Sequence, residues 1–243
     1  MEFNNIKSKF PIFKQKIKGK PLIYLDSANS SQKPKTVIDE ISRFYETEFS
    51  NVGRSVHTLA VKATNKFEET RDIIKSYINA KHREEIIFTK GATEAINLVA
   101  NSFGEKFIKS GDEIIVTELE HHSNYVPWHY LRKKKGAEIK FASVNENGDI
   151  DIDEFKRLIT RKTKIIAFTH ISNVTGAILP VKKIIDLAKS KNIPVLIDGT
   201  QGAPHSVLDV QDLDCDFYAI SCHKMYGPNG LGILYAKKKW LEE

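Results

Sequence analysis

One lysine in this sequence, Lys224, lies where a lysine serving only as a surface residue is hard to explain. It follows the apolar run 217–220, which is typical of a buried strand, and it stands beside Ser221 and His223. An amine among apolar walls and polar groups has a lowered pKa, and such a lysine can form a Schiff base with an aldehyde. We therefore treat Lys224 as a candidate catalytic residue, against the simpler reading that its head reaches solvent.

Two further stretches place polar groups directly after apolar runs. In 89–96, TKGATEAI, Gly91 lets the backbone approach a ligand, and the following helix offers free N–H groups beside the Thr93 hydroxyl. This turn suits a phosphate, although Thr93 followed by Glu94 is also compatible with an ordinary N-terminal cap. In 193–201, an apolar strand leads straight into Asp198, whose carboxylate suits a metal, a base, a cationic ring nitrogen or a loop cap.

The three stretches together match the needs of one ligand. Pyridoxal 5'-phosphate requires a cradle for its phosphate, a carboxylate for its protonated ring nitrogen and a lysine amine for its aldehyde. The turn at 91–93, Asp198 and Lys224 supply these three groups. The sequence therefore predicts a site for this cofactor, provided that the fold brings the three stretches together.

The elements that would position these groups alternate between short apolar runs and amphipathic segments. Apolar spacings of three, four and seven predict a helix over 57–78, and Pro180 begins another helix. This alternation predicts an α/β fold, a three-layer sandwich whose mostly parallel central sheet binds ligands beyond the carboxyl ends of its strands. The expected strands are 85–88, 113–116, 138–141, 164–168, 194–197, 217–220 and 232–235.

Composition indicates a globular protein of one sizeable domain. The 243 residues are 41% hydrophobic and 28% charged, and no apolar run approaches the length of a membrane span. Two cysteines are too few for a disulfide framework, which favours a reducing, cytoplasmic compartment. The net charge of +6 comes from lysines scattered along helices, so neither a nucleic acid nor a membrane is expected as a partner.

Longer segments of the chain resemble the class V aminotransferase family, and most closely its SUF-type cysteine desulfurases. The likeness runs in register from about Tyr24 to the end of the chain, and it implies a fold-type I large domain over 21–243 that binds pyridoxal phosphate, after a basic leader over 1–20. The segments that carry it are YLDSANSSQKP, NVGRSVHTLA, EHHSNYVPW, THISNVTGAILPV, VLIDGTQGAPH and DLDCDFYAISCHKMYGPNGLGILY.

The resemblance implies a role for each of several residues around the cofactor. Lys224 would carry the cofactor and shuttle a proton, and Asp198 would pair with the ring nitrogen. His122, the second of the histidine pair, would stack on the ring and act in catalysis. Gln201 would hydrogen-bond the phenolic oxygen, and Asn173 would contact the substrate carboxylate or the cofactor oxygen.

The phosphate and the partner subunit complete what the resemblance implies. Thr93, Ser221 and His223 would hold the phosphate with N–H groups near Ala92. Relatives are homodimers with shared sites, and the loop at 54–57 lies in a region that approaches the partner's site in relatives. The implied reaction removes sulfur from L-cysteine, giving L-alanine and an enzyme persulfide that a sulfur-acceptor protein uses for iron–sulfur cluster assembly.

The chain departs from the family in one respect that bears on the reaction. In relatives, the nucleophilic cysteine, a substrate-binding arginine and a small domain all follow the lysine, and this sequence contains none of them, so we expect it to match only the large domain. We interpret Cys215 as a small core residue. Cys222, where relatives usually carry glycine, has little freedom to reach a substrate sulfur because it stands two residues before Lys224.

Several alternatives stay open. Selenocysteine lysis, sulfinate removal or transamination could use the same scaffold, and a non-catalytic remnant is a further possibility. A metallohydrolase would use the cluster 118–122 with Asp198, but ELEHH does not have the spacing of the helical HExxH motif. A dinucleotide site at 227–232 has its glycines before a strand instead of a helix, which is the wrong context for a phosphate turn.

Overall fold

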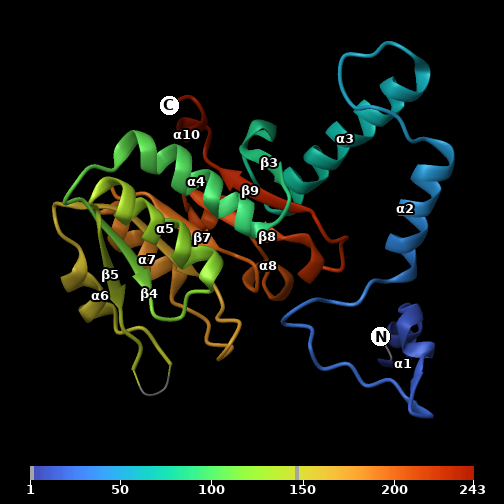
Figure 1. Cartoon of the computed structure of the whole chain (residues 1–243), viewed down its shortest axis with the longest axis horizontal. Helices are drawn as coiled ribbons and strands as arrows, with labels where there is room; N and C mark the ends of the chain where they lie inside the picture. The colour runs from blue at the N-terminus through green and yellow to red at the C-terminus, as the bar shows by residue number, and fades with distance from the viewer. Residues whose placement is uncertain (1–2, 146–147) are drawn as a thin grey trace.

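A seven-stranded sheet forms the centre of the protein in a computed structural model that describes residues 3–145 and 148–243 (Figure 1). The strand order is β3-β9-β8-β7-β6-β4-β5, and β9 alone pairs antiparallel with its two neighbours in this sheet. The mostly parallel sheet is thus confirmed, and every strand lies within a residue of its predicted range. The strands are β3 (Ile86–Thr89), β4 (Glu113–Thr117), β5 (Glu138–Ala142), β6 (Thr163–Thr169), β7 (Val195–Asp198), β8 (Phe217–Ser221) and β9 (Gly232–Ala236).

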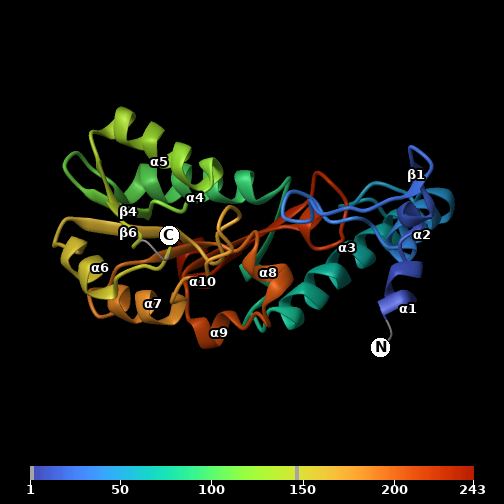
Figure 2. The ribbon, with the colours of Figure 1, turned by 90° about the horizontal axis from the view of Figure 1, so that it is seen from below.

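Helices cover both faces of the sheet and complete three layers. Figure 2 shows α4 (Ala92–Phe107) and α5 (His122–Lys135) on one face, with α6 (Ile152–Leu158), α7 (Val181–Lys189) and α9 (Val210–Leu213) on the other. Successive strand residues point to opposite faces, so they join different clusters of the core. In β4, for example, Ile114 packs with the α4 and α5 side chains, whereas Ile115 packs with those of α7.

The N-terminal part lies beside the sheet and is much more exposed. It contains α1 (Phe3–Ser8), the 3-10 turn η1 (Pro11–Lys14) and the short hairpin of β1 (Lys16–Ile17) and β2 (Lys20–Pro21). The helix α2 (Lys35–Thr47) follows and buries none of its residues. Because the hairpin spans the expected division between a leader over 1–20 and a domain over 21–243, that division stays a prediction.

The helix α3 (Thr58–Tyr77) leads from this part back to the sheet (Figures 1 and 2). Its bounds agree with the helix predicted over 57–78. The remaining connections are short: η2 (Arg83–Glu85), α8 (Gly202–His205), η3 (Cys222–Lys224) and α10 (Lys238–Leu241).

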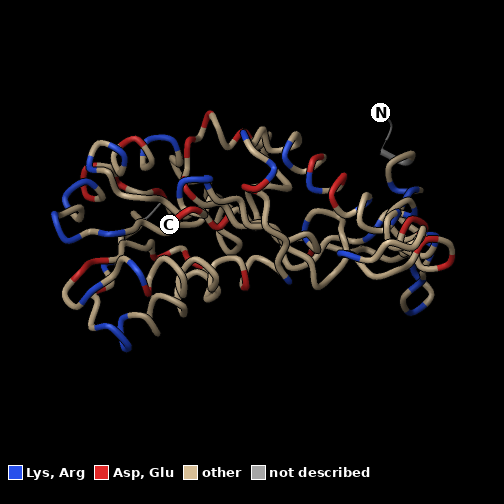
Figure 3. Tube along the Cα trace, turned by 90° about the horizontal axis from the view of Figure 1, so that it is seen from above, with Lys and Arg blue, Asp and Glu red and all other residues tan. Residues whose placement is uncertain are grey.

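Charged residues of both signs are interspersed along the chain rather than gathered on one face (Figure 3). This distribution agrees with solvated helix surfaces. Among residues 3–145 and 148–243, no helix has the length and apolar character required to cross a bilayer.

Candidate active site

The carboxyl ends of the central strands open into a cavity of about 790 Å³. Thr169 of β6 pairs with Asp198 of β7, and Asp198 pairs with Ala219 of β8, so three strand ends meet at one edge. Nearly all of the expected site residues, which lie far apart in the sequence, line this cavity. They are Ala92, Thr93, Asn173, Asp198, Gln201, Ser221, His223 and Lys224.

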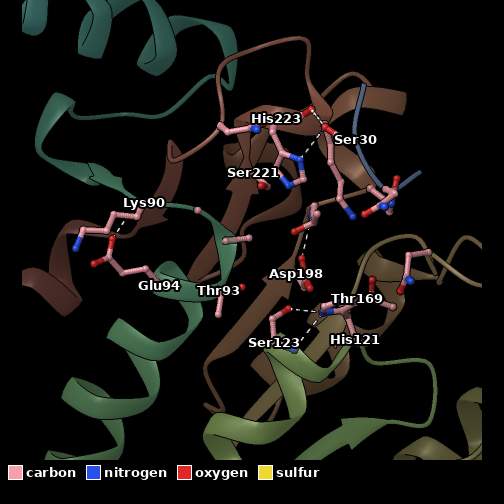
Figure 4. Close-up of a pocket in the computed structure, with 18 of the residues that line it drawn as sticks. Ser30, Lys90, Thr93, Glu94, His121, Ser123, Thr169, Asp198, Ser221 and His223 are labelled. Atoms are coloured by element: carbon pink, nitrogen blue, oxygen red, sulfur yellow. Dashed lines mark hydrogen bonds between the residues drawn. The ribbon is translucent and has the colours of Figure 1, made fainter. Parts of the chain in front are cut away.

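Asp198 lies on the floor of the cavity at the last position of β7, and it is only 3% exposed. Its Oδ1 accepts a hydrogen bond from the Thr200 N–H at 3.0 Å. The Tyr218 ring packs directly against the next residue, since a Cβ at Gly199 would lie 1.8 Å from a ring carbon of Tyr218. Figure 4 shows Asp198 between Thr93 and Thr169, where a carboxylate can meet a cationic group of a ligand.

The N-terminus of α4 and the end of β8 form the anion-binding side of the cavity. Gly91 precedes α4 and makes no side-chain cap, and the Glu94 carboxylate accepts the Lys90 N–H instead. Thr93 can therefore face the cavity without serving as the cap that its sequence position also allowed. Ser221 and His223, from the end of β8 and the turn after it, line the same cavity (Figure 4). Hydroxyl groups, an imidazole and free helix N–H groups are suitable partners for a phosphate.

The close approach of β9 holds this turn in place. A Cβ on Gly232, the first residue of β9, would lie 2.4 Å from the Cα of Gly91, so only glycine fits there. Gly91 itself has φ of 156°, a backbone conformation that favours glycine. The turn at 91–93 is thus defined by β9 as well as by its own sequence.

Lys224 lies in the 3-10 turn η3, directly after β8, and lines the cavity half-buried. Burial lowers the pKa of its amine, whereas the charges of Asp198 and Asp26 act in the opposite direction. Burial also lowers the pKa of neighbouring His223, and Lys224 and Lys33 add to that shift. A lowered pKa increases the fraction of the amine that is neutral, and the neutral amine is the form that attacks an aldehyde.

The histidine that faces the cavity is His121, one residue before the expected His122. His121 caps α5 with an extended backbone, its Nδ1 accepts the Ser123 N–H at 3.1 Å, and it lines the main cavity. His122 is the first helical residue and lines a second cavity of about 410 Å³ with Tyr125 and Phe141. The backbone changes direction between the two histidines, so their side chains diverge, and His121 rather than His122 lines the main cavity.

Other wall residues come from positions to which the sequence pattern assigned no role. Asn29, Ser30, Ser123 and Thr169 all line the cavity. The first two belong to the segment YLDSANSSQKP, which contributed to the family resemblance but carried no assigned chemistry. Gln201 reaches this segment, because its side-chain amide donates to the Ala28 carbonyl at 2.5 Å.

Glu120 is a titratable residue that lines the second cavity, and the sequence suggested it only as a metal ligand. Its carboxyl is hydrogen-bonded to the Thr117 hydroxyl, to the Asn124 amide at 2.6 Å and to the Thr169 N–H at 2.9 Å. Burial raises the pKa of this carboxyl to about 8, and the nearby charge of Asp198 adds to the shift. Glu120 is therefore largely protonated at neutral pH.

Neither cysteine is a good nucleophile in its present surroundings. Cys215 is buried, and desolvation raises the pKa of its thiol to about 12. Cys222 is partly buried beside Lys224, and the same effect raises its pKa to about 11. Because the thiolate is the reactive form, both thiols are nearly inert at neutral pH.

The structure gives little support to the metal and dinucleotide alternatives. In the described part of the chain, no three His, Cys, Asp or Glu side chains are grouped so that they could hold a metal ion. The glycines of 227–232 lead into β9, a strand, as the sequence indicated.

Comparison with known proteins agrees with this arrangement. The family model described as aminotransferase class-V matches residues 23–243. A cysteine desulfurase of Pectobacterium atrosepticum is 47% identical over 237 residues, which are 98% of this chain and 58% of that protein. A probable cysteine desulfurase of Halalkalibacterium halodurans is 48% identical over 243 residues, which are 100% of this chain and 60% of that protein.

Solved structures give the same result. The cysteine desulfurase CsdA of Escherichia coli superposes with a TM-score of 0.88 at 37% identity, over 100% of this chain and 59% of that one. The apo cysteine desulfurase of Thermococcus onnurineus NA1 superposes with a TM-score of 0.93 at 34% identity, with the same coverage. This chain thus spans less than two thirds of the length of the relatives that it matches.

Proposed function

Because this chain belongs to the aminotransferase class-V family, we propose that it acts as a cysteine desulfurase. With pyridoxal 5'-phosphate, it would remove sulfur from L-cysteine and leave L-alanine. The observation that carries the proposal is the convergence of Lys224, Asp198 and the turn at 91–93 on one cavity. The relatives that are named cysteine desulfurase and cover the whole chain add support.

The donor groups around the cavity fit this cofactor. The N-terminus of α4 with Thr93, Ser221 and His223 supplies donors for a phosphate, and the buried Asp198 supplies a carboxylate for a cationic nitrogen. Lys224, which lines the same cavity, supplies an amine of lowered pKa for the aldehyde. When bound, pyridoxal phosphate withdraws electrons from the amino acid joined to it.

The residues around the cavity would then each have a defined role. Asp198 would keep the ring nitrogen protonated, since a buried carboxylate stabilises a neighbouring positive charge. His121 would lie against the ring, while Gln201 and Asn173 would bind oxygen atoms of the cofactor or the substrate. Lys224 Nζ would take the proton from the α-carbon of cysteine and return it as alanine forms.

Sulfur transfer requires a thiolate besides these residues. The C–S bond of cysteine breaks while an S–S bond forms on the attacking sulfur, which then carries a persulfide. Cys215 and Cys222 are poor candidates because burial keeps both protonated. We expect a homodimer in the cytoplasm that hands this sulfur to an acceptor protein for iron–sulfur cluster assembly.

Reductive trapping of the cofactor tests the proposal. The purified chain would be mixed with pyridoxal phosphate, reduced with borohydride and digested, and mass spectrometry would locate the modified lysine. We expect the label at Lys224, its loss in Lys224→Ala, and its retention in Lys133→Ala, which removes an exposed lysine of α5. Labelling at any other lysine would refute the site. Alanine formed from L-cysteine, rather than from its sulfinate or selenium analogue, would identify the reaction.

A further inference from the structure

The backbone carbonyl of His223, whose peptide continues into Lys224, is an unusually crowded acceptor. It accepts hydrogen bonds from the Ser31 N–H at 3.1 Å, the Ser31 hydroxyl at 3.0 Å and the Lys33 ammonium at 2.8 Å. The Ser30 hydroxyl approaches it at 3.4 Å. A carbonyl oxygen has two lone pairs, so four donors around one oxygen exceed what ordinary packing of two loops requires.

Further contacts join the segment around Ser31 to the turn that contains Lys224, and one of these bonds is donated by the turn. The Ser31 hydroxyl oxygen accepts the Tyr226 N–H at 2.8 Å, and Ser30 Oγ lies 3.2 Å from Nδ1 of His223 (Figure 4). Tyr226 has φ of 64°, a left-handed conformation that a bulky residue keeps only when its surroundings hold it. We name residues 30–33, together with these bonds, the clasp on the Lys224 turn.

Lys33 provides the only charged donor of this clasp among the bonds described. Its Nζ bridges the Ser31 carbonyl at 2.7 Å and the His223 carbonyl at 2.8 Å, and the side chain is half-buried. Charge-assisted hydrogen bonds are roughly twice as strong as neutral ones. Because the peptide plane between His223 and Lys224 is rigid, holding its oxygen also restricts the position of the Lys224 Cα, from which the side chain leaves the backbone.

We propose that Lys33, with Ser31, is a positioning residue that aims the Lys224 amine into the cavity. The inference rests on the proposed function of Lys224 as the residue that carries the cofactor. An attacking amine must lie close to its target in the correct direction, and a displacement of about 1 Å can cost about a hundredfold in rate. Lys33 therefore acts on the chemistry through the backbone, without touching the cofactor.

Three variants separate this role from simple support of the fold. Lys33→Met keeps most of the aliphatic stem but removes the ammonium, and Lys33→Arg restores charge and donors. Lys35→Met is the matched control, because Lys35 is two residues away and pairs with Asp39 on the exposed surface of α2. Ser31→Ala removes the hydroxyl bonds but keeps the ammonium, and it replaces Lys33→Met if that variant does not fold.

The first measurement uses the cofactor-free chain. Trace acetylation with acetic anhydride, read by mass spectrometry, reports the reactivity of the Lys224 amine relative to exposed Lys133 in the same molecule. We expect this ratio to rise in Lys33→Met, because the released turn exposes the amine, and to stay unchanged in Lys35→Met. Lys33→Arg should return the ratio toward that of the unsubstituted chain, which a general loss of packing would not produce.

The second measurement follows covalent attachment of pyridoxal phosphate by absorbance and by borohydride trapping at Lys224. We expect attachment to be slower by at least about tenfold in Lys33→Met, with partial rescue in Lys33→Arg. If Lys33→Met matches Lys35→Met in both measurements, the proposal is overturned. If the unsubstituted chain itself attaches no cofactor at Lys224, the proposed function fails, and acetylation alone then decides whether Lys33 positions that amine.

Discussion

At the residue scale, Lys224 and Asp198 could be identified from the sequence because their chemical type conflicts with their position. An amine or a carboxylate directly after a buried strand requires a partner, and the structure places both in one cavity. The histidine pair offered no such contrast, since His121 and His122 are chemically identical neighbours. Only the extended backbone of His121 at the start of α5 decides which ring faces the cavity.

Paired substitutions of the two histidines test this assignment. We expect His121→Ala to weaken retention of pyridoxal phosphate, because the loss of one aromatic contact on a ring face costs about 1 kcal/mol, or roughly fivefold in affinity. His122→Ala removes the same chemical group from the neighbouring cavity and should bind the cofactor normally. Titration of cofactor absorbance gives both dissociation constants. A larger loss in His122→Ala than in His121→Ala would return the ring-facing role to His122.

At the scale of elements, the cavity depends on contacts that no local pattern contains. Strands and helices follow from apolar spacing, whereas the approach of β9 to the turn at 91–93 arises because β9 inserts between β3 and β8. The clasp on the Lys224 turn likewise joins residues that are about 190 positions apart. Neither contact leaves a periodic signature in the sequence, so pattern analysis could locate the groups of the site but not the contacts that support it.

Gly232→Ala tests the importance of the close approach between β9 and the anion-binding turn. A methyl group at this position would meet the backbone of Gly91, which cannot move as a flexible side chain would. We expect the free energy of unfolding to fall by about 1–3 kcal/mol and the affinity for pyridoxal phosphate to fall as well. Urea unfolding and cofactor titration measure the two effects.

Leu231→Ala is the control for this substitution, since it shortens the side chain directly before β9 and leaves the backbone approach unchanged. Stability losses in both variants with unchanged cofactor affinity would show that the turn at 91–93 does not depend on β9. An affinity loss confined to Gly232→Ala would show that it does.

At the scale of the whole molecule, the sheet was predictable and the N-terminal part was not. Parallel strands covered on both faces are largely apolar, which makes them visible as short continuous runs, whereas the edge strand β5 is only partly buried. Residues 22–61 also carry apolar side chains, yet Ile23, Leu25 and Val56 are 79%, 92% and 93% exposed. An apolar pattern indicates that a segment tends to be buried, but it does not identify the surface against which the segment packs.

Glu120 links the site to the stability of the whole molecule, because it joins the ends of β4 and β6 to the first turn of α5. In the folded chain the pKa of its carboxyl is about 8, above its ordinary value of 4.5. Between these two values the folded state keeps a proton that the unfolded state releases. The contribution of Glu120 to stability is therefore fully present below about pH 4.5 and is lost as the pH rises through about 8.

Urea unfolding across this pH window tests the coupling. Within the window, one such proton changes the free energy of unfolding by at most ~1.4 kcal/mol per pH unit. We expect the unsubstituted chain to lose stability between about pH 5.5 and about pH 7.5, and Glu120→Gln, which is neutral throughout, to lose less over the same interval. Glu118→Gln, on the exposed side of the same loop, should keep the full dependence. Equal slopes in Glu120→Gln and Glu118→Gln would mean that Glu120 is ionised in the folded protein, so that a carboxylate and not a carboxylic acid accepts the bonds from Thr117, Asn124 and Thr169.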